Sequence, residues 1–419
     1  SFKPWEDEYY ECFGVNAKSI RLNSETDIKQ RINALTGEIN NEHNLFLITY
    51  NSVPNLLEYL IKFCKAKKNK TMLVCDEAHK IKNLDGIWSS NILTLSPHVK
   101  SRVVLTGTPI PNGYEDLVNL FRFIYPSRDI IKFRADYLKV LNTSPYSSNV
   151  KKLIDNIRPY FIRIKKSDLN LPRITSDKTV SYSCTDFEKS IYKKLLEANE
   201  DISGDVQKKG LHLRLVQSIY NPKLLTKKQI DSHGFFDFSE SQINIKNILG
   251  EKLFSQIESL GDEYNPSRHF LALSLTKEII KKGGKVVLWG GFIDSIKRLH
   301  RLLSKNGLQG DIVIGETKKE TNKSNLFSDE EKTRERIIEK FKKEGGGLDY
   351  IITNPIVLGE SISLHKSCHH SIYFELGYSA APYIQSRDRI HRVWIVDGKQ
   401  KQYNTHYNHI VSNEIINRV

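Results

Sequence analysis

Residues 74–83, V-C-D-E-A-H-K-I-K-N, place two acidic residues and a histidine directly after the apolar run 72–75. A short apolar run that ends in charged residues is typical of a buried strand reaching the carboxyl edge of a parallel sheet, where such sheets bind ligands. Asp76 and Glu77 could hold a cation at that edge. Taken alone, the pair is also typical of an ordinary strand exit, so the rest of the chain has to decide.

Short apolar runs and amphipathic segments alternate along the chain. Runs rich in Val, Ile and Leu are found at 45–50, 71–76, 101–107, 285–290, 311–315, 348–353 and 370–375. Apolar residues recur at helical spacing in 56–65, 116–125 and 293–305. This alternation predicts an α/β fold with parallel sheets and helices on both faces of each sheet.

The alternating pattern occurs twice, which predicts a division of the chain into three parts. The first α/β block is expected at 1–175 and the second at 268–419. Residues 176–267 lack strong strand runs, so we expect a helical insertion and linker there. The polar segment 316–336 is expected to be a surface loop that runs into a helix.

The composition favours a globular protein that meets polyanions. The 419 residues are 39% hydrophobic and 27% charged, enough for two or three domains with proper cores. Lys and Arg number 63 against 49 Asp and Glu, and this excess of +14 favours nucleic acid over acidic partners. The sequence shows no apolar stretch of membrane-spanning length and no secretory leader. The expected location is intracellular: cytoplasmic in a prokaryote or virus, nuclear in a eukaryote.

The cysteines predict neither a disulfide framework nor a zinc ribbon. They are odd in number, scattered, and form no C-x-x-C: Cys12, Cys64, Cys75, Cys184 and Cys368. A reducing compartment fits this pattern. One cluster offers possible metal ligands, but a closed site needs four well-directed donors, so a polar loop or helix end is favoured for His365, Cys368, His369 and His370.

Two further segments carry chemistry-bearing residues. Residues 103–112, V-V-L-T-G-T-P-I-P-N, end a strand with Thr106, Gly107 and Thr108, small groups that suit a close approach of backbone to another element. The alternative is an ordinary turn. In 384–394, I-Q-S-R-D-R-I-H-R-V-W, spacings of four and three predict one helical face for Gln385, Arg389 and Arg392. The alternative is that these arginines simply lie on a solvent-exposed face of the helix.

Together and in this order, the three segments resemble the Swi/Snf-like DNA translocases, a branch of the superfamily-two helicase ATPases. Nearly the whole chain takes part in the resemblance, which implies two RecA-like lobes with ATP between them and duplex DNA across both. The supporting segments are 4–14 (after motif Ia), 46–53 (motif Ib), 158–172 and 213–225 (family signatures), 285–299 (motif IV), Gly315, Arg334, Phe341, 352–364 (motif V) and 385–392 (motif VI).

The resemblance implies roles at the nucleotide. Asp76 would hold Mg²⁺, and Glu77 would orient and deprotonate the attacking water. His79 would couple the nucleotide site to the segment Thr106, Gly107 and Thr108. The opposite lobe would deliver two arginine fingers, Arg389 and Arg392, and Gln385 would sense closure of the lobes.

The resemblance also implies contacts to the DNA backbone. The candidate groups are Thr49, Tyr50, Lys80, Lys82 and residues Ser361 to Ser363. Such contacts reach phosphate and carry no base sequence, so we expect little sequence preference. Closing the lobes in each ATP cycle would ratchet them along duplex DNA.

The sequence departs from the family pattern in three places. It contains no glycine-rich loop ending in GK[ST]: the stretches G-G-K at 283–285 and G-G-G at 345–347 precede strands instead of following them, and neither has a Lys-Ser or Lys-Thr pair. We expect that loop upstream of Ser1, on the same polypeptide or on a partner chain that completes the first lobe; this chain alone should bind ATP poorly. Ser361 replaces a family glycine, and Trp394-Ile395 replaces Gly-Gln.

The favoured hypothesis is an ATP-dependent translocase on double-stranded DNA that remodels or strips DNA-bound proteins. Segments 158–172 and 213–225 favour it over a strand-separating DNA or RNA helicase. A third hypothesis is a non-catalytic DNA-binding or scaffolding module that has lost its ATPase, which the missing loop favours. Retention of both acids and both arginines argues against this third hypothesis.

Overall fold

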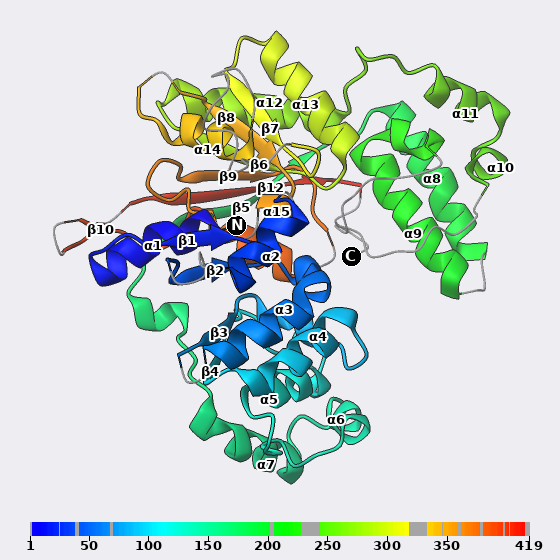
Figure 1. The fold of residues 1–419 in the computed structure, drawn as a ribbon. Helices are drawn as coiled ribbons and strands as arrows, with labels where there is room; N and C mark the ends of the chain where they lie inside the picture. Colours follow the sequence, from blue (N-terminus) through cyan, green and yellow to red (C-terminus); the bar gives the residue numbers. More distant parts are fainter. Residues whose placement is uncertain are drawn as a thin grey trace. The chain divides into compact units, whose positions relative to one another are not determined.

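The computed structural model describes residues 2–24, 26–37, 42–67, 70–201, 205–227, 244–317, 333–345, 347–358, 362–377, 380–396, 399–401 and 403–414. The chain divides into two compact units, with residues 1–165 in the first and residues 166–320 and 326–419 in the second (Figure 1). All parallel pairings lie within one unit or the other, so the α/β fold with parallel sheets is confirmed.

The first unit holds two short parallel sheets among helices. β1 (Ser19–Arg21) pairs with β2 (Leu45–Leu47), and β3 (Met72–Cys75) pairs with β4 (Ser101–Val104). The helices are α1 (Lys3–Phe13), α2 (Ile28–Thr36), α3 (Val53–Ala66), α4 (Ile87–Leu95), α5 (Leu117–Ile124), α6 (Ala135–Leu141) and α7 (Ser148–Ile157).

The core of the first unit follows from helical spacing. In α3, Leu56, Leu60 and Cys64 recur every four residues, so they lie on one face and are buried. That face packs with Cys75 at the end of β3. The predicted helices at 56–65 and 116–125 correspond to α3 and α5, and the three predicted strands of this unit are found.

The second unit is built on a six-stranded sheet whose order is β5-β12-β9-β6-β8-β7, with every neighbouring pair parallel. Its strands are β5 (Ile174–Tyr182), β6 (Val286–Trp289), β7 (Gly310–Val313), β8 (Tyr350–Thr353), β9 (His370–Tyr373) and β12 (Thr405–Ser412). A small hairpin of β10 (Ile395–Val396) and β11 (Lys399–Gln400) precedes β12.

Helices bury both faces of this sheet. Val286 and Leu288 pack with α12 (Ser267–Lys281) and α13 (Ile293–Lys305). Val287 and Trp289 pack on the other face with α14 (Arg334–Lys342). Because successive side chains of a strand point to opposite faces, a strand covered on both sides is apolar throughout. α15 (Pro355–Leu358) and α16 (Ala380–Arg387) follow β8 and β9.

Residues 176–267 contain the expected helices, which are α8 (Asp186–Asp201), α9 (Asp205–Tyr220), α10 (Ile245–Leu249) and α11 (Glu251–Glu258). They have a hydrophobic core of their own. The prediction that this segment lacks a strand was wrong, because β5 extends to Tyr182. β5 pairs only with β12 among the described residues, and most of its side chains are exposed and polar, which hides the apolar pattern of a strand. The three-part division at residues 175 and 267 stays a prediction.

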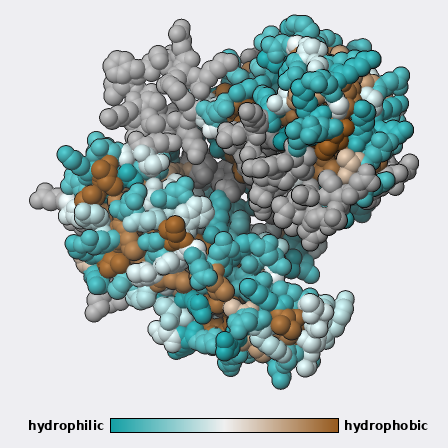
Figure 2. Space-filling view, turned by 90° about the vertical axis from the view of Figure 1, so that its right-hand side faces the viewer, coloured by the Kyte–Doolittle hydropathy of each residue, from teal (hydrophilic) through white to brown (hydrophobic). Residues whose placement is uncertain are grey.

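The described surface is mainly polar. Figure 2 shows one face, on which hydrophilic residues predominate and hydrophobic residues form separate patches. None of the described helices is long and apolar enough to cross a membrane. The predicted loop at 316–336 lies largely outside the described residues.

Candidate active site

The acidic pair lies at a sharp corner after β3. The Leu105 amide donates to the Cys75 carbonyl at 2.9 Å, and the Ala78 amide donates to the Leu105 carbonyl at 2.9 Å. These bonds hold the corner beside the end of β4. Glu77 itself has φ 49° and ψ 48°, in the left-handed region that side chains other than glycine rarely adopt. The chain then enters a 3-10 turn at Ala78–Ile81.

Three groups fix Asp76. Its Oδ1 accepts a hydrogen bond from the Glu77 amide at 2.9 Å, and its Oδ2 accepts one from the indole Nε1 of Trp5 at 3.2 Å. The Tyr50 hydroxyl donates to the Asp76 carbonyl at 2.8 Å. Burial, followed by the neighbouring Cys75 and then by Asp76 and Glu77, raises the pKa of Tyr50, so its hydroxyl keeps the proton that it donates.

His79 connects the acidic corner to the segment after β4. Its Nδ1 lies 3.3 Å from Glu77 Oε2 and 3.3 Å from Thr106 Oγ1. Thr106 Oγ1 also accepts a hydrogen bond from the Thr108 amide at 3.1 Å. The structure therefore brings the predicted coupling residues within hydrogen-bonding distance. The close approach expected at Gly107 is not found, since a Cβ there would meet no described atom within 4 Å.

The other predicted residues of the first unit follow β2 and β3. Thr49 and Tyr50 follow β2, and Thr49 Oγ1 lies 2.9 Å from Ser52 Oγ. Lys80 lies in the 3-10 turn, Lys82 follows it, and both are half-buried. The carboxyl ends of β2, β3 and β4 thus carry all the predicted site residues of this unit.

In the second unit, the predicted arginines do not share one helical face with Gln385. α16 ends at Arg387, and residues 388–390 form a turn. The helix ends there because the Arg389 amide bonds to the Ser386 carbonyl, three residues back, instead of continuing the helical pattern. Arg389 and Arg392 therefore lie beyond the helix.

The two guanidinium groups are held by the segment that precedes β9. Arg389 is only 5% exposed, and it donates through Nε to the Gln385 carbonyl at 2.9 Å and through Nη1 to the Ile362 carbonyl at 3.2 Å. Arg392 donates through Nε to the Asp388 carbonyl at 2.9 Å and through Nη1 to Ser363 Oγ at 2.6 Å. The segments that resemble motifs V and VI thus meet. Ser361 lies outside the described residues.

Two residues to which the sequence analysis assigned no role at the site contact this machinery. Trp5 bonds to Asp76 across 71 positions, and Tyr403 bonds to the Arg392 amide at 2.7 Å across 11 positions. Trp5 belongs to a segment that resembles the family, so comparison with that motif could have indicated an indole donor near the acids. Tyr403 follows the departure at Trp394, and no spacing pattern singles it out.

The histidine cluster is packed among aromatic rings. His365 is buried, and burial, followed by the charge of Arg392, lowers its pKa to about 4. Its ring lies edge-on to Trp394 at 6.1 Å, and His369 stacks on Tyr403 at 4.9 Å. Cys368 is buried with a free thiol. The described residues contain no group of three or more His, Cys, Asp or Glu placed to hold a metal ion.

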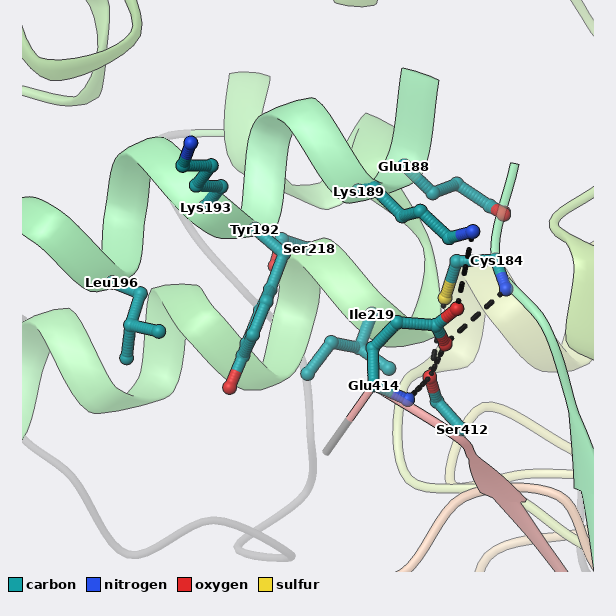
Figure 3. A pocket seen from close by; sticks show the side chains of 10 residues that line it. All are labelled: Cys184, Glu188, Lys189, Tyr192, Lys193, Leu196, Ser218, Ile219, Ser412 and Glu414. Carbon is teal, nitrogen blue, oxygen red and sulfur yellow. Dashed lines mark hydrogen bonds and ion pairs between the residues drawn. The ribbon is translucent and has the colours of Figure 1, made fainter. Parts of the chain in front are cut away.

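A pocket of about 290 Å³ in the second unit contains none of the predicted site residues (Figure 3). It lies between α8, α9 and the end of β12. Glu414 accepts hydrogen bonds from Ser412 Oγ at 2.5 Å and from the Cys184 amide at 3.3 Å, and it pairs with Lys189 at 3.4 Å. These bonds fasten the end of β12 to the helices.

Comparison with known proteins gives a match to a family model described as the SNF2-related domain over residues 8–234, more than half of the chain. An uncharacterized ATP-dependent helicase of Mycoplasma pneumoniae is 26% identical over 359 residues, covering 83% of this chain and 29% of that protein. Chromodomain-helicase-DNA-binding protein 8 of Danio rerio is 25% identical over 232 residues, covering 54% of this chain and 8% of that protein.

Among solved structures, the Sulfolobus solfataricus SWI2/SNF2 ATPase core in complex with dsDNA matches with 19% identity and a TM-score of 0.34, over 98% of this chain and 75% of that chain. This chain spans less than a third of the length of the two curated relatives.

Proposed function

Since the chain belongs to the SNF2-related domain family, we propose that it is part of an ATP-dependent motor that moves along double-stranded DNA without strong sequence preference. Two relatives are named as helicases, one of them as ATP-dependent and the other as DNA-binding. The observation that carries the proposal is the acidic corner after β3, where His79 lies 3.3 Å from both Glu77 and Thr106.

The residues of that corner fit a magnesium nucleotide. Mg²⁺ prefers oxygen ligands, and Asp76 presents a carboxylate whose orientation is fixed by two hydrogen bonds. When bound there, the ion would supply positive charge that neutralises part of the phosphate charge. Asp76 would hold the ion, with nucleotide phosphates and water completing its ligands.

Glu77 would act as the general base. Its carboxylate would orient the attacking water and accept its proton, while His79 holds one carboxylate oxygen in place. Through Thr106, the same histidine would report the state of the nucleotide to the segment after β4. Arg389 and Arg392 of the second unit would neutralise charge that develops on the γ-phosphoryl group when the units close, and Gln385 would sense that closure.

The DNA would contact residues at the same strand ends. Lys80 and Lys82 supply positive charge beside the acidic corner, Thr49 and Tyr50 supply polar groups there, and Ser363 supplies a hydroxyl in the second unit. Contacts of this kind reach phosphate oxygens and are insensitive to base sequence. The segments 158–172 and 213–225, which resemble those of duplex translocases, favour double-stranded DNA as the track.

A second polypeptide segment would supply the phosphate-binding loop that this sequence lacks. The sheet of β3 and β4 leaves apolar side chains in solvent, with Met72 64%, Val103 36% and Leu105 42% exposed. An exposed apolar patch on a sheet is typical of a surface that another element covers. We propose that the segment carrying the loop covers these residues and completes the nucleotide site.

The test is ATP hydrolysis by the native polypeptide or assembly that contains this chain. We expect stimulation by duplex DNA that exceeds stimulation by single-stranded DNA or RNA. Glu77→Gln should lower kcat by roughly a hundredfold or more, because a general base contributes about that factor. Glu58→Gln is the matched control: Glu58 lies on α3 and pairs with Lys62 at 2.6 Å, and its loss should leave kcat unchanged.

Two results would overturn the proposal. Stimulation by RNA alone would assign the chain to the strand-separating helicases that act on RNA. Duplex binding without hydrolysis in the complete assembly would assign it to the non-catalytic modules.

A further inference from the structure

The Tyr403 hydroxyl forms hydrogen bonds to both the amide and the carbonyl group of Arg392. The Arg392 amide donates to the Tyr403 hydroxyl at 2.7 Å, and the Tyr403 hydroxyl donates to the Arg392 carbonyl. A phenol can accept one hydrogen bond and donate another at the same oxygen, which suits this pair of bonds. Tyr403 therefore fixes the peptide groups on either side of the Arg392 Cα.

The ring of Tyr403 is itself fixed by aromatic neighbours. It stacks on His369 at 4.9 Å with an interplanar angle of 27°, and it lies 6.1 Å from Trp394. The Lys401 ammonium lies 4.2 Å above the Trp394 ring, and the Lys401 amide donates to the Trp394 carbonyl at 2.7 Å. These contacts leave the hydroxyl little freedom to move away from Arg392.

One of these aromatic partners, Trp394, lies where the sequence departs from the family pattern. Trp394 and Ile395 replace the expected Gly-Gln, and the hairpin of β10 and β11 begins at Ile395. The hairpin returns the chain so that Tyr403 reaches back to Arg392. The departure therefore adds a brace to the arginine segment.

We propose that Tyr403 is a positioning residue for Arg392, acting through the backbone to aim the guanidinium group at the nucleotide. This inference rests on the proposed function of Arg392. The Arg392 side chain is anchored from the other direction, through Nη1 to Ser363 and Nε to the Asp388 carbonyl. A catalytic group displaced by about 1 Å can lose two orders of magnitude in rate, so a rigid backbone beneath the arginine is of direct use.

The direct test is Tyr403→Phe in the complete native assembly. Phenylalanine keeps the ring and its stacking on His369 but removes both bonds to Arg392. We expect kcat for duplex-stimulated ATP hydrolysis to fall roughly tenfold, which corresponds to about 1.4 kcal/mol. KM for ATP should stay within about twofold, because the arginine acts on charge that develops only in the transition state.

Tyr220→Phe is a matched control within the same unit. The Tyr220 hydroxyl donates to the Leu376 carbonyl at 2.8 Å and accepts from the Leu376 amide at 3.1 Å, so this tyrosine makes the same pair of bonds to a single residue. Losing the pair there should lower the thermal midpoint while kcat is retained. A role for Tyr403 that is only structural would make the two variants alike in both measurements.

A double-substitution cycle tests the route of the effect. Tyr403→Phe should have no further effect on kcat in an Arg392→Ala background, since the group that it positions is gone. Losses that multiply would overturn the inference, as would a kcat for Tyr403→Phe within about twofold of the parent. If the parent assembly does not hydrolyse ATP, the proposed function fails first and the inference falls with it.

Discussion

Glu77 holds a left-handed backbone conformation although it is not glycine. Such a conformation costs about 1–3 kcal/mol and persists only where the surroundings enforce it. Here the Ala78 amide is bonded to Leu105, and the carboxylate is bonded to His79. The strained residue is the one to which we assign the general base, so the strain and the proposed chemistry coincide.

Thr106→Val tests the link between the nucleotide corner and the segment after β4. Valine keeps the shape of threonine but loses the contact to His79 and the bond from the Thr108 amide. We expect ATP hydrolysis without DNA to stay within about twofold and the stimulation by duplex DNA to fall roughly fivefold or more, the size of a typical coupling between sites. Both rates are measured in one steady-state assay.

The control for this substitution is Thr94→Val at an exposed position of α4, where the hydroxyl bonds to the Ser90 carbonyl of its own helix at 2.9 Å. It should change neither rate. Equal stimulation in Thr106→Val and in the parent would contradict the coupling role.

Several site residues could be predicted because they lie in contiguous motifs. Asp76, Glu77, His79 and Thr106 follow apolar runs, and the structure places them at neighbouring strand ends. Trp5 could not be linked to Asp76 by local reasoning, since nothing in its surroundings indicates a partner 71 positions away. The spacing in 384–394 was misleading, because a pattern of four and three residues cannot reveal that the helix stops at Arg387.

At the scale of elements, β6 shows how burial on both faces makes a strand recognisable. All four of its residues are buried, and the run V-V-L-W has no polar interruption. β5 and β12 form an eight-residue parallel pair in the same sheet, yet neither was predicted. β12 carries histidine and asparagine among its apolar residues, and β5 alternates polar side chains at an edge, so both lack the apolar run on which the prediction relied.

Trp289→Ala should destabilise the second unit more than any exposed substitution in the same sheet. Its side chain is fully buried, and its Nε1 donates to Ser371 Oγ at 2.8 Å. Removing a buried tryptophan costs about 3–5 kcal/mol in free energy of unfolding. Ile174→Ala in β5, where the side chain is 39% exposed, should cost about 1 kcal/mol or less. Urea titration measures both, and equal midpoints would contradict the assignment of β6 to the core.

At the scale of the whole molecule, buried neutral histidines make the second unit sensitive to acid. Burial, followed by the charge of Arg268, lowers the pKa of His269 to about 3, and His365 is lowered to about 4. An unfolded chain protonates these histidines near pH 6.5, whereas the folded unit does not. Between pH 6.5 and pH 4 the unfolded state therefore binds more protons, so the folded state loses stability as pH falls.

His365→Phe should reduce this dependence. Phenylalanine fits among the rings of Trp394 and Tyr403 and cannot bind a proton. The free energy of unfolding should then fall less steeply on acidification. The slopes of the variant and the parent should differ by about 1.4 kcal/mol for each pH unit below 6.5. Urea titrations at a series of pH values between 7 and 5 give the two slopes. Parallel slopes for the variant and the parent would show that His365 is protonated in the folded state.

β12 lies between β5 and β9 in the sheet, although β5 precedes it by more than two hundred residues. During synthesis on a ribosome, β5 emerges long before β12, and its edge lacks this partner until β12 leaves the exit tunnel. Parallel pairing between segments so distant in sequence is slow and leaves a nascent chain open to aggregation. Translation that stalls before residue 405 would therefore release a polypeptide that depends on chaperones, even though most of its helices and strands are already made.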